Sequence, residues 1–420
     1  MRTWLLSIAA VKIRLFPLIV AGCVLAFPAY KGMVVGYVPV FAGLAIAVAL
    51  LLGKDAASRA AAPDHRYVWS ILLYAAPALV QFGLLLVFRP APLFDGLFVY
   101  RHAEVLAATG AMDPMTYYPP AQTWWYASWF AAFGVSPLVA QLSQIPLSLG
   151  VTWTVYQLTR NLADERSARL AALATAWYPS FVVYVLTTPY YHYLYTLLTV
   201  VMTWGVMRFH QSDRFGVGLG WMLVAGLAAG AGALTKAVQL IAPLQVLTWW
   251  FVLGLRTSPP WRKWASGFAV FAFGMAAWLG PWMLRNHQVF DDWVPVCTSG
   301  GLVLYSANNP DSNGLYSAMP DEVVLSTPAE MLAHTRWCSD QAKRFMVEQP
   351  LAFLDLAWRK FLHTWGVEAT FTELINWRGE GRGWIKPAFS AVAATGWAAM
   401  VALLGVSAYF LRDTVSLGSG

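Results

Sequence analysis

The sequence predicts an all-α polytopic membrane protein, a bundle of about ten transmembrane helices of roughly 20 residues each. Hydrophobic residues make up 58% of the 420 positions and charged residues only 12%, against roughly 25% charged in an average soluble domain. The 22 Trp residues fit this class, because Trp gathers where membrane meets water. The composition excludes a disordered chain and disfavours a soluble one. The net charge of +7 indicates cytoplasmic loops rather than a nucleic-acid partner.

Long apolar runs define the predicted spans, since a helix needs about 20 mostly apolar residues to cross a bilayer. The first run follows basic residues, but a second one begins almost at once, which favours a span over a cleavable signal peptide. The predicted spans are 13–30, 33–53, 67–88, 137–159, 168–186, 188–207, 216–234, 237–255, 264–284 and 387–411.

The positions of Lys and Arg predict the orientation of these spans. With the N-terminus inside, most basic residues fall in short inside segments, and cytoplasmic loops are where Lys and Arg accumulate. We therefore expect both chain ends inside and two long outside segments, 89–136 and 285–386. The short segments predicted to lie outside contain only these basic residues: Lys31, Arg89, Arg101 and Lys236.

The outside segment 89–136 is predicted to contain two helices. "GLFVYRHAEVLAATG" (96–110) reads as an amphipathic helix with Leu97, Val99 and Ala103 on its apolar face. Gly110 is a natural stop for this helix, and Asp95 is a favoured residue for its N-terminal cap. "AQTWWYASWFAAFG" (121–134) is short and rich in Trp, which favours a helix lying at the membrane surface.

The outside segment 285–386 is predicted to be a small, mainly helical domain. Ser326 or Thr327 would cap a first helix, with Pro328 in its first turn. A second helix would run from Pro350 to Gly366, and "NNPDSNG" before them has the composition of a loop. Arg285 would begin this segment as a loop residue. The predicted division of the chain is 1–66, 67–284, 285–386 and 387–420.

Two cysteines, Cys297 and Cys338, fall in this outside domain. An oxidising compartment would allow a disulfide between them, but sequence does not fix their separation. Free thiols and a disulfide both remain open. The spacing of the cysteines does not match a zinc site.

Polar residues collect at the outside ends of the predicted helices. Asp95 stands where the third span ends, and Glu104 follows in the same outside segment. "TYYPPAQTWW", "TTPYYHYLY" and "LTKAVQ" lie at or near the outside ends of other predicted helices. Polar groups facing one compartment and surrounded by aromatic rings indicate one shared cavity.

The order of these motifs resembles that of membrane glycosyltransferases with the C-type (GT-C) fold, among the relatives of protein O-mannosyltransferases and of the lipid A aminoarabinose transferase. "FDGLFVYRHAEVLAATG…YYPPAQTWWY" follows the family's acidic motif, amphipathic helix and Pro-Pro element. "AGLAAGAGALTKAVQLIAPL" matches a Gly/Ala-rich helix with a basic residue after "LT". "PWMLRNHQVFDDWVPVCTSGGLVLYSANNP" (281–310) is the most specific segment and is typical of bacterial members. The resemblance covers about residues 67–365.

The resemblance implies transfer of a sugar from a polyprenyl-phosphate donor to a glycan, lipid-linked polymer or protein acceptor. Asp95 would be the catalytic base, which takes the proton of the acceptor hydroxyl. Lys236 and Arg285 would bind the donor phosphate and stabilise the leaving group. The further candidates for substrate binding are Tyr100, Glu104, Tyr117, Tyr118, His192, Asn308 and Asn309.

The sequence departs from the family pattern at Gly96, where many members carry a second acid. We therefore expect no metal-binding residues and no obligatory cofactor, although a divalent cation could help to neutralise the phosphate. The expected partners are the lipid-linked donor, the bilayer and the acceptor. The expected location is the bacterial inner membrane, with the site on the extracytoplasmic face.

A flippase or transporter of lipid-linked saccharide is the alternative function. Transporters place charged groups along a pathway at mid-membrane depth and are often built from inverted repeats. In this sequence the charges avoid the middle of the predicted spans and no repeat is evident. The sequence therefore favours the enzyme.

Overall fold

The computed structural model describes residues 66–88, 92, 94–114, 117–186, 191–254, 260–314, 327–364, 391, 394–398 and 400. Within these ranges the regular structure is helical and contains no strand, which confirms the all-α prediction. The predicted spans 13–30 and 33–53 lie outside the described residues, as does most of 387–411. Ser326 and Gly366, named as helix boundaries, also lie outside them.

The first described helical unit is one apolar rod with a local irregularity. Helix α4 (Arg66–Ser70) continues through the π-helical turn η3 (Ile71–Ala75) into α5 (Ala76–Phe88). Residues Tyr67–Val87 are long and apolar enough to cross a membrane, in agreement with the predicted span 67–88. Most of this surface faces outward, and Leu73, Gln81 and Leu85 are buried.

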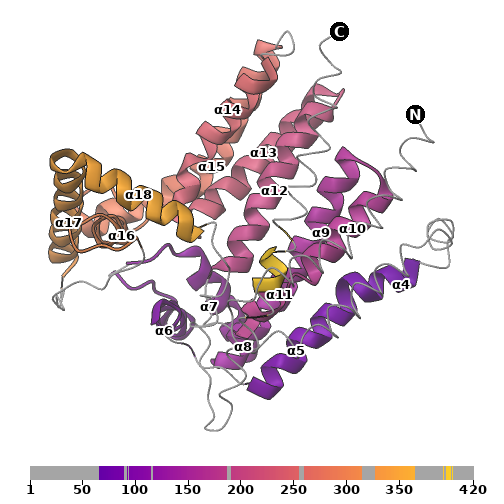
Figure 1. The fold of residues 1–420 in the computed structure, drawn as a ribbon, viewed down its shortest axis with the longest axis horizontal. Helices are drawn as coiled ribbons and strands as arrows, with labels where there is room; N and C mark the ends of the chain where they lie inside the picture. Colours follow the sequence, from indigo (N-terminus) through magenta and orange to yellow (C-terminus); the bar gives the residue numbers. More distant parts are fainter. Residues whose placement is uncertain are drawn as a thin grey trace.

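Helices α6 (Phe94–Thr109) and α7 (Ala121–Phe133) pack against each other at one end of the bundle (Figure 1). Gly110 ends α6 with a positive φ of 70°, as predicted. The buried face differs from the predicted one, because Leu97 is exposed whereas Tyr100 is buried with Val99 and Ala103. The ring of Phe130 in α7 covers Tyr100, with ring centres 5.2 Å apart.

Two bent helix pairs follow. Helix α7 and the unit of α8 (Pro137–Leu142) and α9 (Gln144–Leu162) differ in direction by 119°. Helix α10 (Glu165–Ala176) and the unit of α11 (Pro179–Val183) and η4 (Tyr184–Leu186) differ by 51°. The bends occur at Gly134–Ser136 and at Trp177–Tyr178, each directly before a Pro that begins the next helix, where helices often end.

Three long helices form the centre of the bundle (Figure 1). Helix α13 (Phe215–Ala233) packs between α12 (His192–Gln211) and α15 (Trp261–Phe290). The 3₁₀ turn η5 (Ala237–Ile241) and helix α14 (Ala242–Gly254) connect α13 to α15. The shared core is built from small residues of α13 and larger side chains of its neighbours: Met202, Val206, Phe209, Ala225, Ala229, Phe271 and Met275.

Glycines allow α13 and α15 to approach closely. A Cβ atom at Gly226 would overlap the carbonyl oxygen of Phe271, and one at Gly274 would lie 2.9 Å from the backbone of α13. Small residues permit this backbone contact between membrane helices. No side chain larger than hydrogen fits at Gly226 unless the helices separate.

We therefore expect Gly226→Ala to destabilise the bundle by about 1–3 kcal/mol, the usual cost of overpacking a well-packed core. The matched control is Gly220→Ala on the same helix, where a Cβ would meet nothing within 4 Å. The melting temperature of detergent-purified protein measures both changes. Equal melting temperatures for the two variants would contradict the proposed close contact.

The candidate spans agree with the sequence prediction where the structure describes them. Three described helices are long and apolar enough to cross a membrane, or up to five spans if each bent pair counts as one. Phe215–Ala233 and Trp261–Phe290 match predicted spans, and Ala237–Phe251 is a shorter apolar helix. Helix α12 overlaps most of the predicted span 188–207. The total of about ten spans stays a prediction.

Arg285 does not begin a loop, contrary to the sequence expectation. Helix α15 continues past the predicted end of its span to Phe290, and Arg285 lies inside it. The helix ends at Asp291, which has a left-handed φ of 50° and donates its backbone N–H to the His287 carbonyl. The polar residues after Leu284 ended the apolar run but did not end the helix.

Helices α16 (Ser299–Ala307), α17 (Pro328–Glu348) and α18 (Pro350–Thr364) follow α15. Thr327 caps α17 in a reciprocal capping box with Glu330, which confirms the predicted start. Phe290 and Val294 pack on Met331 of α17. Cys297 and Cys338 are free thiols, and burial raises the pKa of the Cys297 thiol.

Candidate functional site

Asp95 is exposed and lies in the first turn of α6, because the helix begins at Phe94. It is therefore not the cap of a helix starting at Gly96, although an acid in the first turn still interacts favourably with the helix dipole. The hydroxyl of Tyr118 donates a 2.6 Å hydrogen bond to Asp95 Oδ1. The carboxylate is thus held against the Pro-Pro loop.

Aromatic rings pack beside this carboxylate. Phe98 lies one turn after Asp95, and its ring centre is 5.2 Å from that of Tyr118 and 4.1 Å from that of His102. Tyr117 and Tyr118 meet edge to face at 4.7 Å. Burial lowers the pKa of His102, and the nearby Asp113 carboxylate opposes this shift. The Tyr118 ring thus packs against Phe98, and its hydroxyl contacts the exposed Asp95 carboxylate.

Lys236 lies directly before η5, where α13 has ended. Its Nζ is 4.5 Å from the ring centre of Tyr191 and 5.9 Å from that of Tyr195, both at the start of α12. Tyr195 in turn donates a 3.0 Å hydrogen bond to the buried Gln239. Two tyrosine faces therefore hold the ammonium group of Lys236 at this helix end.

A backbone hydrogen bond joins the Asp95 side of the site to the Lys236 side. The N–H of Ala121, the first residue of α7, donates to the carbonyl of Leu234 over 2.9 Å. Leu234 is buried with Trp282 and Val296, and Ala121 and Trp124 pack against this cluster. Three segments far apart in the sequence therefore meet at one place.

Arg285 is part of the same junction. Its Nη2 donates a 2.8 Å hydrogen bond to the carbonyl of Asp113, and its Cζ is 5.0 Å from the ring centre of Trp282. Trp282 donates through Nε1 to the carbonyl of Val296 over 2.6 Å. Arg285 therefore links α15 to the loop between α6 and α7.

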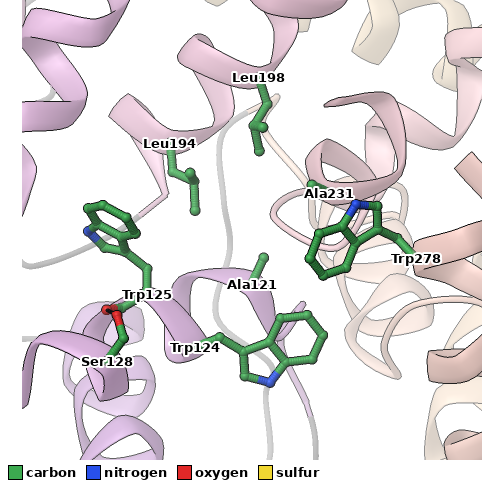
Figure 2. Close-up of a pocket in the computed structure, with 8 residues that line it drawn as sticks. All are labelled: Ala121, Trp124, Trp125, Ser128, Leu194, Leu198, Ala231 and Trp278. Atoms are coloured by element: carbon green, nitrogen blue, oxygen red, sulfur yellow. Dashed lines mark hydrogen bonds between the residues drawn. The ribbon is translucent and has the colours of Figure 1, made fainter. Parts of the chain in front are cut away.

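An apolar cavity of about 270 Å³ lies between α7, α12, α13 and α15. Figure 2 shows Leu194 and Leu198 of α12 pointing toward α7, with Trp124 and Trp278 facing the same space. Trp125 is fixed by hydrogen bonds from its Nε1 to Ser143, 3.1 Å to Oγ and 3.3 Å to the carbonyl. The lining residues are Ala121, Trp124, Trp125, Ser128, Leu194, Leu198, Ala231 and Trp278.

The cavity adjoins the Lys236 end of the site. Ala231 lies one helical turn before Thr235, whose hydroxyl donates to the Ala231 carbonyl over 2.8 Å. Leu194 lies one turn after Tyr191, and residues three apart are neighbours on a helix face. The cation and the apolar cavity are therefore adjacent.

Other predicted substrate-binding residues have structural partners in this arrangement. Tyr100 is buried in the α6–α7 core. Glu104 pairs with Arg101 at 3.1 Å on the helix surface. His192 stacks on Tyr184, with ring centres 4.7 Å apart, beside Tyr191 of the Lys236 group.

The two asparagines of the 281–310 motif order the end of α16. Asn308 donates to the Leu304 carbonyl and accepts a 2.6 Å hydrogen bond from Lys360. Asn309 donates to the Tyr305 carbonyl and accepts from the backbone of Asp311. Their side-chain amides are engaged within α16, the loop after it and α18.

Sequence reasoning did not single out Tyr191, Tyr195 or Trp278. The run "TTPYYHYLY" showed that tyrosines gather before α12, but only helical spacing places Tyr191 and Tyr195 on one face. Trp278 lies inside an apolar helix, where a Trp carries no distinctive signal. In the described ranges no three His, Cys, Asp or Glu side chains group in a way that could hold a metal ion.

One segment of the chain matches a known protein family. Residues 118–281 match the dolichyl-phosphate-mannose-protein mannosyltransferase family. This segment contains the Pro-Pro element, the tyrosine run and Lys236, and the match confirms the resemblance predicted from the sequence. No curated protein matches the chain at a significant level.

Solved structures that are similar to the chain include two of one protein. ArnT from Cupriavidus metallidurans bound to undecaprenyl phosphate has 18% identity and a TM-score of 0.49, over 80% of this chain and 60% of that one. The same protein in the apo state has 17% identity and a TM-score of 0.45, over 79% and 59%. The chain therefore spans about 60% of the length of these proteins.

Proposed function

We propose that the protein is a membrane glycosyltransferase that moves a sugar from a polyprenyl-phosphate donor to an acceptor hydroxyl. The observation that carries the proposal is the junction of the Asp95 loop with the Lys236 helix end through the Ala121–Leu234 hydrogen bond. This hydrogen bond joins the loop of Tyr118, whose hydroxyl contacts Asp95, to the helix end before Lys236, and the family match covers Lys236.

Lys236 and Arg285 bind the donor phosphate in this proposal. Both are held by aromatic rings and lie in segments that converge on the Leu234 cluster. Cations held in place before the reaction stabilise the charge that develops on a leaving phosphate. The ring contacts keep the flexible Lys236 side chain oriented, which lowers the entropy cost of binding.

The cavity beside Lys236 holds the first isoprene units of the donor. Its walls are Trp and Leu side chains, which suit a branched hydrocarbon and exclude water. The remainder of the lipid chain extends into the bilayer. This arrangement keeps the phosphate at the depth of Lys236 while the tail stays in an apolar environment.

Asp95 acts as the general base. The acceptor hydroxyl attacks the anomeric carbon, its proton passes to the Asp95 carboxylate, and the bond to the polyprenyl phosphate breaks with inversion. Tyr118 orients the carboxylate through its hydrogen bond. The attack of the acceptor hydroxyl on the anomeric carbon is a single displacement, and one positioned carboxylate is enough to take its proton.

The remaining candidates have one of two roles in this proposal. Tyr117, Tyr118 and His192 present ring faces and polar atoms to the sugar or acceptor, as aromatic residues commonly do. Glu104, Tyr100, Asn308 and Asn309 support the helices and loops around them. The site faces the extracytoplasmic side of a bacterial inner membrane, and the acceptor is a glycan, a lipid-linked polymer or a protein.

A reconstituted assay tests the function directly. Purified protein in liposomes is given a radiolabelled polyprenyl-phosphate sugar and mixed acceptors from a bacterial envelope. Transfer of label to an acceptor supports the enzyme. Movement of the labelled lipid between leaflets without transfer would replace it with the flippase alternative.

Removal of the Tyr118 hydroxyl should have a modest effect on transfer. Tyr118→Phe keeps the ring contacts but loses the hydrogen bond to the exposed Asp95, worth about 1 kcal/mol. We therefore expect kcat to fall about fivefold, with the melting temperature lowered by no more than about 2–4 °C. Tyr305→Phe on α16 is the control, and an unchanged kcat for Tyr118→Phe would show that the contact does not position the base.

A further inference from the structure

A cation surrounded by tryptophans lies at the end of α12 remote from Lys236. The Arg208 patch consists of Arg208 and Trp204 of α12, Trp221 of α13 and Trp153 of α9. The Cζ of Arg208 is 5.4 Å from the ring centre of Trp221. Trp204 lies between the other two indoles, with ring centres 5.0 Å from Trp221 and 5.5 Å from Trp153.

Two hydrogen-bond donors in the patch lack an acceptor. The Nε of Arg208 and the Nε1 of Trp204 are buried and have no hydrogen-bond partner in the described part of the chain. Both groups can only donate, and positions i and i+4 share one helix face. A group with several acceptor oxygens would satisfy both donors at once.

The patch lies away from the proposed transfer site and at the surface of the bundle. An α-helix rises about 1.5 Å per residue, so His192 and Arg208 are about 24 Å apart along α12. Trp153 is 45% exposed, and the three helices that carry the patch belong to the membrane bundle. The Trp153 edge of the patch therefore lies at the surface of the bundle.

Three other cations near this end of the bundle have partners of their own. Lys263 donates to the Ser212 carbonyl over 3.1 Å. Arg160 and Arg169 both pair with Glu165, at 3.5 and 2.8 Å. The guanidinium of Arg208 instead rests on an indole ring, and its buried Nε–H has no acceptor in the described part of the chain.

We propose that the Arg208 patch binds the phosphodiester headgroup of an anionic phospholipid. The phosphate oxygens accept hydrogen bonds from the Arg208 guanidinium and from the Trp204 indole. The acyl chains lie along the exposed face of Trp153. Tryptophans are common at this depth of a membrane protein, and an arginine pairs with phosphate through several N–H groups.

Native mass spectrometry of the full-length protein tests this site. Phosphatidylglycerol is titrated into detergent-purified protein, with phosphatidylcholine as the uncharged comparison. Arg208→Ala should weaken the tightest phosphatidylglycerol binding about tenfold. Trp204→Phe keeps an aromatic ring, although a smaller one, but removes the N–H, and should weaken binding about threefold. The matched control is Arg262→Ala, because Arg262 also lies over an indole, 5.5 Å from the Trp261 ring.

The outcomes separate the possible sources of the phosphate. Selective loss of phosphatidylglycerol binding in the Arg208 and Trp204 variants, with Arg262→Ala unchanged, supports the proposal. Equal affinities in Arg208→Ala and Arg262→Ala, measured on variants with unchanged melting temperature, would overturn it. Displacement of the lipid by millimolar inorganic phosphate would also overturn it, since the patch would then be a site for the free ion.

Discussion

Replacement of Asp95 by Asn is expected to lower kcat for sugar transfer by about 10²- to 10⁴-fold, the usual contribution of a general base. Asn has the shape of Asp and can still accept the hydrogen bond from Tyr118, but it cannot take the proton of the acceptor hydroxyl. Donor binding should persist, because the phosphate ligands are untouched. Single-turnover transfer of a radiolabelled sugar measures the change.

The control for this prediction is another acid on the same helix. Glu104 is partly exposed and pairs with Arg101, so Glu104→Gln should leave kcat within about twofold, as expected for a surface pair of little energetic weight. The two variants change the charge of α6 equally. If Asp95→Asn retained full activity, or if both variants lost it to the same extent, Asp95 would not be the base.

Replacement of Lys236 by Ala is expected to weaken donor binding about 10- to 100-fold. A hydrogen bond to a charged group contributes about 1.5–3 kcal/mol, and each 1.4 kcal/mol corresponds to tenfold in affinity. Lys236→Arg keeps the charge between Tyr191 and Tyr195 and should retain part of the affinity. Mass spectrometry of co-purified lipid and titration with polyprenyl phosphate measure the effect.

The matched control is Lys343→Ala, which removes an exposed lysine of α17. It should keep the affinity of the wild-type protein. Polyprenyl phosphate bound to the wild type and to Asp95→Asn but lost from Lys236→Ala would support the two assigned roles. Retention of the lipid in Lys236→Ala would assign the phosphate to other residues and leave Lys236 a structural role.

Local signals in the sequence predicted local structure well. Thr327, one of the two predicted caps, caps α17 in a capping box with Glu330, and both partners lie within four residues of each other. Gly110 ends α6 as expected, since a positive φ favours glycine. The prediction that Arg285 begins a loop was wrong, because it was based on hydropathy. Hydropathy marks where a helix leaves the lipid, whereas α15 continues beyond that point to Phe290.

The buried face of α6 shows why packing was harder to predict. Hydrophobicity placed Leu97 inside, but the structure exposes it and buries Tyr100 against Phe130. Which face of α6 is buried depends on the helix that packs against it. That helix is α7, and its direction differs by 119° from that of the next unit. Gly134 and Pro137 mark the position of this bend in the sequence, but they do not specify its angle.

The sequence predicted which segments would form the candidate site, but it did not predict the contacts between their side chains. Motif order indicated that Asp95, Lys236 and Arg285 belong together. The contacts of Lys236 with Tyr191 and Tyr195 required the relative positions of α12 and α13. The hydrogen bond between Asp95 and Tyr118 depends on a turn of the Pro-Pro loop that residue types alone do not specify.

The hydrogen bond from Ala121 to Leu234 uses only main-chain atoms. Side chains on both segments can therefore diverge during evolution without loss of the link, and a comparison of covarying side chains would not detect it. Proline at position 121 is the substitution that removes the donor, because proline has no N–H. An engineer who wished to change the donor lipid could redesign the tryptophan and leucine side chains that line the cavity and leave this backbone hydrogen bond intact.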